Sequence, residues 1–138
     1  MDVAGFVDLL DRLAAAWAAP DPVAAADCFT DDAVYMEPPD RQLFVGREQL
    51  LAYFWPLEPG TYLRFHARAF DEAGQVGFAE WTFGMDGKDV ADTGVAVVEV
   101  RDGRIATWRE YHVKGPADWD RFRSTEGKEW QWHIGNYP

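Results

Sequence analysis

The second half of the chain constrains the fold most, because it consists of strand-like stretches separated by turn sequences. Asp86-Gly87 and Asp102-Gly103 are strong signals for tight β-hairpins. Together with a turn at residues 71–74, they separate four predicted strands, at residues 61–70, 75–85, 92–101 and 104–114. Four such strands in succession predict a meander, and therefore a mainly antiparallel sheet.

Three predicted helices precede these strands. The first covers residues 3–18, where Asp2 can act as the N-cap and apolar residues recur every three or four positions. The second starts at Asp21-Pro22 and runs to Phe29, and the third covers residues 47–54. Helices followed by a meander predict an α+β fold, in which a strongly curved sheet wraps over the three N-terminal helices as a cone with an apolar mouth.

Length and composition limit the number of domains, the partners and the kinds of site that the chain can have. The length predicts a single domain over residues 1–138, with residues 115–138 as a C-terminal extension. A formal net charge of −11 argues against nucleic acid and anionic membranes as partners, because both attract clustered Lys and Arg. The chain begins without a basic segment and has no apolar run of 18 residues, so a cytoplasmic protein is expected. Cys28 is the single cysteine and the three histidines are scattered, so neither a disulfide, a metal site nor a cofactor is expected.

Residues 33–37 form a further predicted strand, which ends in an acid. Asp31-Asp32 turn the chain before it, and the alternation of side chains places Tyr35 and Glu37 on the same face. If that face meets an apolar cavity, burial would raise the pKa of Glu37 and suit this carboxyl to proton transfer. The alternative is a solvated carboxylate at the mouth of the cone.

Three motifs resemble SnoaL-like and ketosteroid isomerase-like proteins of the NTF2-like superfamily. The sequence Phe-Thr-Asp-Asp-Ala at 29–33, followed by a short strand and Glu37-Pro38, resembles their turn and acid-ending strand. Gly-Arg-Glu-Gln at 46–49 resembles the start of their third helix, and residues 98–111 resemble their last hairpin. The resemblance covers residues 5–114 and implies the cone fold, cofactor-free acid/base chemistry and a homodimer through the outer face of the sheet.

The resemblance also implies roles for individual residues. Glu37 stands where the isomerases carry an aspartate as the general base, so it is expected to abstract a proton. Similarity to the isomerases puts Trp108, Glu110 and His112 of the last strand inside the cavity. Tyr35, which shares a strand face with Glu37, and His112 would then hold or protonate the substrate oxygen. Glu110 would orient His112, because a buried carboxylate needs a partner.

The other residues expected to contact the substrate are mostly apolar. Leu13 and Ala96 fall near the places where the isomerases carry the tyrosine and the aspartic acid of their oxyanion hole, so steroid isomerisation itself is not expected. His66 is expected to point away from the cavity. The full set of expected substrate-binding residues is Leu13, Trp17, Phe54, Trp81, Phe83, Ala96, Trp108 and Glu110.

The sequence therefore predicts an enzyme for isomerisation, cyclisation or dehydration of a small apolar carbonyl or polyketide-like substrate. Two alternatives stay open at this point. One is a non-catalytic domain that binds a small hydrophobic ligand, and the other is a structural dimer whose cavity is filled by Trp and Phe. The volume of the pocket would distinguish the structural dimer from the enzyme and from the ligand-binding domain.

Two further expectations concern surfaces. Tyr62, Phe78 and Tyr111 would be exposed on the outer face of the sheet, and exposed apolar patches of this kind favour a homodimer through that face. The C-terminal extension is expected to form a short helix around Trp119 and then a strand-like stretch at 129–134. It is expected to pack on the outer face of the sheet or on a partner subunit; the alternative is a lid over the mouth of the cone.

Overall fold

One sheet of six strands organises the computed structural model, which describes residues 1–127. The strand order is β2-β1-β6-β5-β4-β3. β1 pairs with β6 in parallel, and every other neighbouring pair of strands is antiparallel. The strands are β1 (Phe29–Glu37), β2 (Gln42–Val45), β3 (Thr61–Asp71), β4 (Val76–Met85), β5 (Val90–Arg101) and β6 (Arg104–Pro116).

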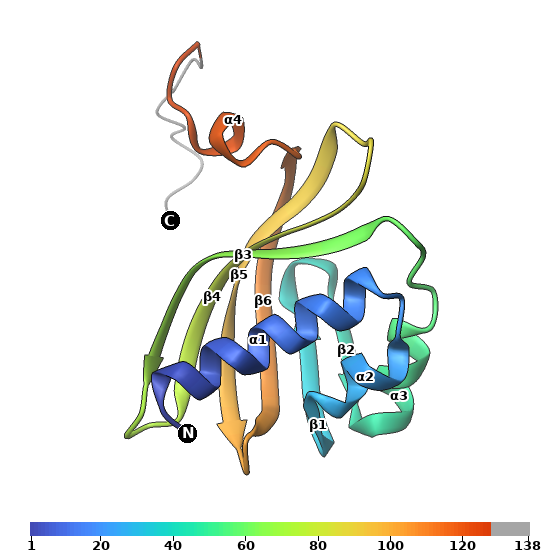
Figure 1. The fold of residues 1–138 in the computed structure, drawn as a ribbon, viewed down its shortest axis with the longest axis vertical. Helices are drawn as coiled ribbons and strands as arrows, with labels where there is room; N and C mark the ends of the chain where they lie inside the picture. The colour runs from blue at the N-terminus through green and yellow to red at the C-terminus, as the bar shows by residue number, and fades with distance from the viewer. Residues whose placement is uncertain (128–138) are drawn as a thin grey trace.

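The main helices gather on one side of this sheet. Figure 1 shows α1 lying across the sheet, with α2 and α3 beside β1 and β2. Asp2 caps α1 by accepting a hydrogen bond from the Gly5 backbone N–H at 2.8 Å, and Pro22 sets the first turn of α2. Within residues 1–127, no helix is long and apolar enough to cross a membrane. The helices are α1 (Val3–Ala18), α2 (Pro22–Asp27), α3 (Gly46–Phe54) and α4 (Trp119–Arg123).

The apolar stripe of α1 forms the core against the sheet. Phe6 and Leu10 are fully buried, and Leu13 is 1% exposed. Phe6 stacks on Phe70 of β3 with 4.6 Å between the ring centroids. The predicted α+β fold, with helices covered by a curved and mainly antiparallel sheet, is therefore confirmed.

The segment around the start of β1 differs from its prediction. α2 ends before Phe29, which begins β1, so Asp31 and Asp32 lie within the strand and not in a turn. Both aspartates are exposed and face basic partners, because Asp31 lies 3.4 Å from Arg104 and Asp32 pairs with Arg101. Opposite charges on neighbouring strands let acidic residues occupy the solvent face of a sheet.

The sequence does not predict β2 or the short 3-10 helix η1 (Pro38–Asp40). β2 has four residues and is mostly exposed, so it lacks the apolar alternation that marks a longer strand. Its register places Gln42 opposite Glu37 and Phe44 opposite Tyr35. This edge segment therefore brings new side chains next to the acid at the end of β1.

Small residues in β5 make room on the inner face of the sheet. Gly94 lies between Trp81 of β4 and His112 of β6, and Ala96 lies beside Glu110. A Cβ at Gly94 would approach a backbone oxygen of β6 to 2.4 Å and the His112 Cβ to 2.8 Å, so a larger residue would force a backbone shift. Glu110 and His112 can therefore extend over β5 toward the helices.

The described part of the C-terminal extension packs on the outer face of the sheet. Trp119 of α4 stacks on His66 with 3.8 Å between ring centroids, and His66 Nε2 lies 2.9 Å from Thr82 Oγ1. Thr82 alternates with the inward-facing Trp81, so His66 points away from the interior, as predicted. The strand predicted at 129–134 lies outside the described residues.

Candidate active site

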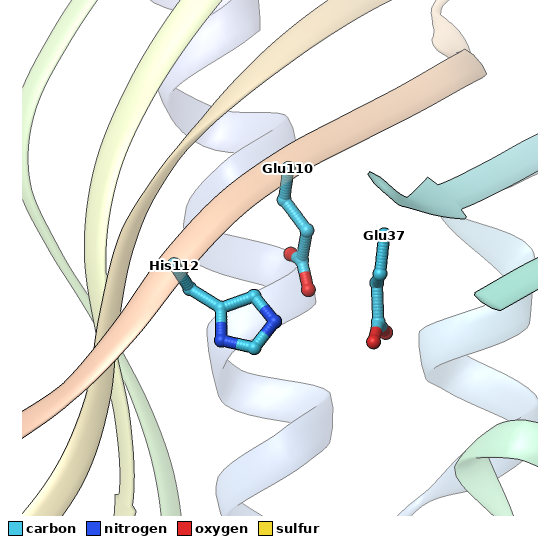
Figure 2. A group of neighbouring side chains, drawn as sticks. All are labelled: Glu37, Glu110 and His112. Carbon is cyan, nitrogen blue, oxygen red and sulfur yellow. The ribbon is translucent and has the colours of Figure 1, made fainter. Parts of the chain in front are cut away.

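Glu37, Glu110 and His112 bring their side chains together at the end of β1 (Figure 2). Glu110 and His112 share the inner face of β6 because strand side chains alternate, and β1 runs parallel beside β6. One nitrogen or oxygen atom of each side chain lies within 4.8 Å of the other two. Glu37 is 4% exposed and Glu110 is 5% exposed, so the site holds two buried carboxyl groups.

Glu37 accepts a hydrogen bond at each of its carboxyl oxygens. The Tyr53 hydroxyl, from α3, donates to Oε1 at 2.8 Å. The Gln42 side-chain amide, from β2, donates to Oε2 at 2.8 Å. Donors aimed at both oxygens stabilise the charged form of a carboxyl group. Glu37 is therefore placed to act as a carboxylate, and two separate elements fix its orientation.

The surroundings of Glu110 favour its neutral, protonated form instead. Burial raises the pKa of Glu110 to about 8, and the nearby Glu37 charge adds to this effect, although hydrogen bonds from Trp108 and Tyr35 work against it. The Trp108 indole N–H donates to Glu110 Oε2 at 2.6 Å. At neutral pH, Glu110 therefore carries a proton and can donate a hydrogen bond.

His112 has partners other than the expected Glu110. Its Nε2 lies 3.1 Å from Asp40 Oδ2 in η1, and its Nδ1 lies 3.7 Å from Asp92 Oδ1 in β5. Despite the short distance to Asp40, the buried Nε2 makes no hydrogen bond of suitable geometry within residues 1–127. Two aspartates therefore flank His112, and Glu110 is paired with Trp108 instead.

Tyr35 lies beside the two carboxyl groups. It is 2% exposed, and its ring stacks near that of Trp108 with 6.0 Å between centroids. The Tyr53 hydroxyl lies 3.4 Å from the Tyr35 hydroxyl. Burial raises the pKa of Tyr35 and of Tyr53 well above that of an exposed tyrosine, so both hydroxyls stay protonated and serve as donors.

A cavity of about 30 Å³ lies next to this group, inside the cone. Apolar and aromatic side chains form most of its wall, together with two tyrosines and Glu110. Phe54 and Ala96, which the sequence predicts as substrate contacts, are buried but do not border this cavity. The lining residues are Leu13, Trp17, Tyr35, Tyr53, Leu63, Trp81, Phe83, Trp108 and Glu110.

A larger pocket of about 250 Å³ adjoins the cavity at the mouth of the cone. Trp17, Tyr53 and Phe83 line both spaces and therefore stand between them. Phe54 lines this mouth pocket, together with apolar residues of the loop that follows α3. A ligand with an apolar body fits the mouth pocket, and the inner cavity has room for only a small polar end.

Several residues of the site are not predicted from the sequence. Tyr53 follows the buried Leu50 by three positions in α3, so helical spacing alone places both on one face. Gln42, Asp40 and Asp92 give no comparable signal. The first two reach the site only because β2 and η1 fold back along the end of β1.

Glu37, Glu110 and His112 are residue types that ligate divalent transition metals, and their spacing would allow a shared ion. Two features favour proton chemistry over metal binding. Glu110 keeps a proton at neutral pH, and each oxygen of Glu37 already accepts a hydrogen bond. An ion would have to displace the proton and at least one of these hydrogen bonds.

A family model described as a SnoaL-like domain matches residues 10–108. The match spans more than half of the 138 residues, so the chain belongs to the SnoaL-like domain family. Among curated proteins, none matches this sequence at a significant level.

Solved structures share the fold at low sequence identity. An NTF2-like protein of unknown function from Burkholderia xenovorans LB400 is 21% identical, with a TM-score of 0.67, over 89% of this chain and 95% of its own. A protein of unknown function with a cystatin-like fold from Methylobium petroleophilum PM1 is 18% identical, with a TM-score of 0.70, over 95% and 99%. An LEH-like epoxide hydrolase of M. tuberculosis is 21% identical, with a TM-score of 0.66, over 80% and 84%. At these identities the likeness concerns the fold alone.

Proposed function

We propose that this protein is an enzyme that performs cofactor-free acid/base chemistry on a small apolar carbonyl or polyketide-like compound. Isomerisation, cyclisation and dehydration all fall within this class. The observation that carries the proposal is the pairing of a buried, doubly hydrogen-bonded Glu37 with a buried Glu110 that stays neutral at pH 7. Neighbouring groups whose surroundings separate their pKa values are the usual sign of assigned acid and base roles.

The mechanism follows from these protonation states. The Glu37 carboxylate takes a proton from the carbon next to the substrate carbonyl. Negative charge then develops on the carbonyl oxygen, and the neutral Glu110 donates a hydrogen bond to it. The Tyr35 hydroxyl and the His112 imidazole are further groups near this position. Loss of one such donor typically lowers a rate by about a hundredfold or more.

The small inner cavity favours a second candidate function, a non-catalytic ligand-binding or structural protein. A volume of about 30 Å³ holds little more than one or two water molecules. The catalytic reading therefore requires the carbon skeleton to sit in the mouth pocket of about 250 Å³, with its polar end directed past Trp17, Tyr53 and Phe83. The two candidates differ in whether proton transfer to and from carbon occurs at the site.

Exchange of carbon-bound protons tests the proposal without knowledge of the natural substrate. Small ketones such as cyclohexanone and 2-cyclohexenone are incubated with the protein in D₂O, and loss of their α-proton signals is followed by NMR. We expect wild-type protein to accelerate the exchange, and Glu37→Gln to lower the acceleration by roughly a hundredfold or more. Glu48→Gln, an identical change at an exposed position of α3, serves as the control.

Treatment with EDTA should leave the exchange rate unchanged, because the proposed proton transfer by Glu37 and Glu110 requires no metal ion. The same rate in wild type and in Glu37→Gln would contradict the proposal and favour the ligand-binding candidate.

A further inference from the structure

Two tryptophans in the cavity wall carry polar atoms without a partner. The Nε1 atoms of Trp17 and Trp81 are buried and make no hydrogen bond within residues 1–127. Trp17 is 6% exposed and Trp81 is 3% exposed. A buried N–H without an acceptor lowers stability, and most such groups in folded proteins find one. Two of them in the wall of one small cavity point to an acceptor that the cavity is built to receive.

Trp108 provides the comparison within the same cavity. Its indole N–H donates to Glu110 at 2.6 Å, so a tryptophan in this wall can be fully paired. The two tyrosine hydroxyls of the wall also have partners, and the other lining residues are apolar. Within residues 1–127, the two side chains of the lining that keep an unpaired buried polar atom are therefore Trp17 and Trp81. An indole N–H is a donor only, so a matching ligand must supply acceptors.

The two indoles also lie where a ligand would pass. Trp17, in the last turn of α1, lines both the mouth pocket and the inner cavity. Trp81 lies in β4, across Gly94 from His112, and its ring centroid is 6.0 Å from that of His112. The polar end of a ligand whose body fills the mouth pocket therefore meets Trp17 at the entrance and Trp81 next to the candidate active site.

We propose that the indole N–H groups of Trp17 and Trp81 select ligands that carry an acceptor oxygen on a small apolar body, such as ketones, lactones and esters. Hydrocarbons of the same shape leave both N–H groups unpaired and bind more weakly. Ligands that offer only donors, such as ammonium ions, fail for the same reason. The inference rests on the proposed function in one respect, namely that ligands occupy this cavity. It concerns ligand binding and not proton transfer.

Indole N–H resonances in ¹⁵N–¹H spectra of the full chain, assigned by triple-resonance experiments, test the proposal. Cyclohexanone is the probe, and methylenecyclohexane, which replaces the oxygen with a CH₂ group, is its matched control. We expect cyclohexanone to move the Trp17 and Trp81 indole proton signals downfield, because they gain an acceptor, and methylenecyclohexane to leave them nearly unchanged.

A variant provides an independent check. Trp81→Phe should weaken cyclohexanone binding about five- to tenfold, the usual effect of one lost hydrogen bond, and leave methylenecyclohexane binding unchanged. Equal shifts with both probes, or no shift of either indole signal up to the solubility limit of cyclohexanone, would overturn the proposal. The spectra need no turnover. A failed exchange assay with a positive indole result would therefore refute the proposed enzymatic activity and support the oxygen-selective binding site.

Discussion

The Tyr53 hydroxyl donates a hydrogen bond to one carboxyl oxygen of Glu37, and the Gln42 side-chain amide donates to the other. Glu110 is buried beside that carboxyl group, and the Trp108 indole N–H donates to its Oε2. The first arrangement stabilises a charge, and the second raises the pKa of Glu110 to about 8. Two residues of the same type therefore have opposite electrostatic surroundings. Strand alternation predicts that Glu110 and His112 share one face of their strand, and the resemblance to the isomerases indicates that this face is the inner one. Neither predicts the partners of Glu37 and His112 that come from α3, β2 and η1.

Glu110→Gln should change how stability depends on pH. The folded protein holds a proton on Glu110 up to about pH 8, whereas an unfolded chain releases it near the ordinary pKa of 4.5. Between these pH values unfolding releases a proton, so the free energy of unfolding of the wild type falls as the pH rises. The variant lacks this loss, and its stability relative to wild type should rise across the window, by at most roughly 5 kcal/mol. Urea unfolding at a series of pH values measures this, and a constant difference between the two proteins would refute it.

At the scale of elements, the helices and the meander are predictable because each carries a strong local signal. Asp2 and the apolar stripe define α1 to its ends, and the Asp-Gly pairs define the turns that flank β5. The start of β1 and the whole of β2 are not predictable from such signals. Their stability comes from arginines of the neighbouring hairpin and from pairing with β1, contacts between residues far apart in sequence.

Gly94 in β5 should be indispensable for the shape of the inner face. In Gly94→Ala, the new Cβ would meet a backbone oxygen of β6 at 2.4 Å and the His112 Cβ at 2.8 Å. We expect a loss of about 1–3 kcal/mol of unfolding free energy and a displaced His112. Val95→Ala, at the next and exposed position, is the control and should change stability far less. Thermal unfolding measures the difference, and equal melting temperatures of the two variants would show that the sheet relaxes around the new methyl group.

At the scale of the whole molecule, part of the outer face of the sheet is apolar and exposed. Phe78 is 52% exposed, Val95 39%, Tyr111 46% and Val113 59%. The strand register places Val95 directly opposite Tyr111, with Val113 in the next outward-facing row. Contiguous exposed apolar patches usually mark an interface. We propose that two copies of the chain associate through this face, as the resemblance to related proteins implies.

Val95→Asp should weaken this dimer, because it places a charge in the middle of the patch. Val23→Asp, at a 50% exposed valine of α2, is the matched control and should leave the dimer intact. Each chain has a formal charge of −11, so added salt should strengthen the wild-type association by screening repulsion. Sedimentation velocity at several protein and salt concentrations measures all three effects. A wild-type monomer at micromolar concentration would contradict the proposed interface.

In the proposed site, Glu110 keeps its proton at neutral pH beside the hydrogen-bonded carboxyl group of Glu37. Carbon-13 NMR of the glutamate side-chain carboxyls, with the two signals assigned from Glu37→Gln and Glu110→Gln, tests it most directly. We predict that the Glu110 carboxyl titrates with a pKa of about 8. A Glu110 signal that titrates at the pKa of an exposed glutamate, about 4.3, would contradict the account and leave the site without its proton donor.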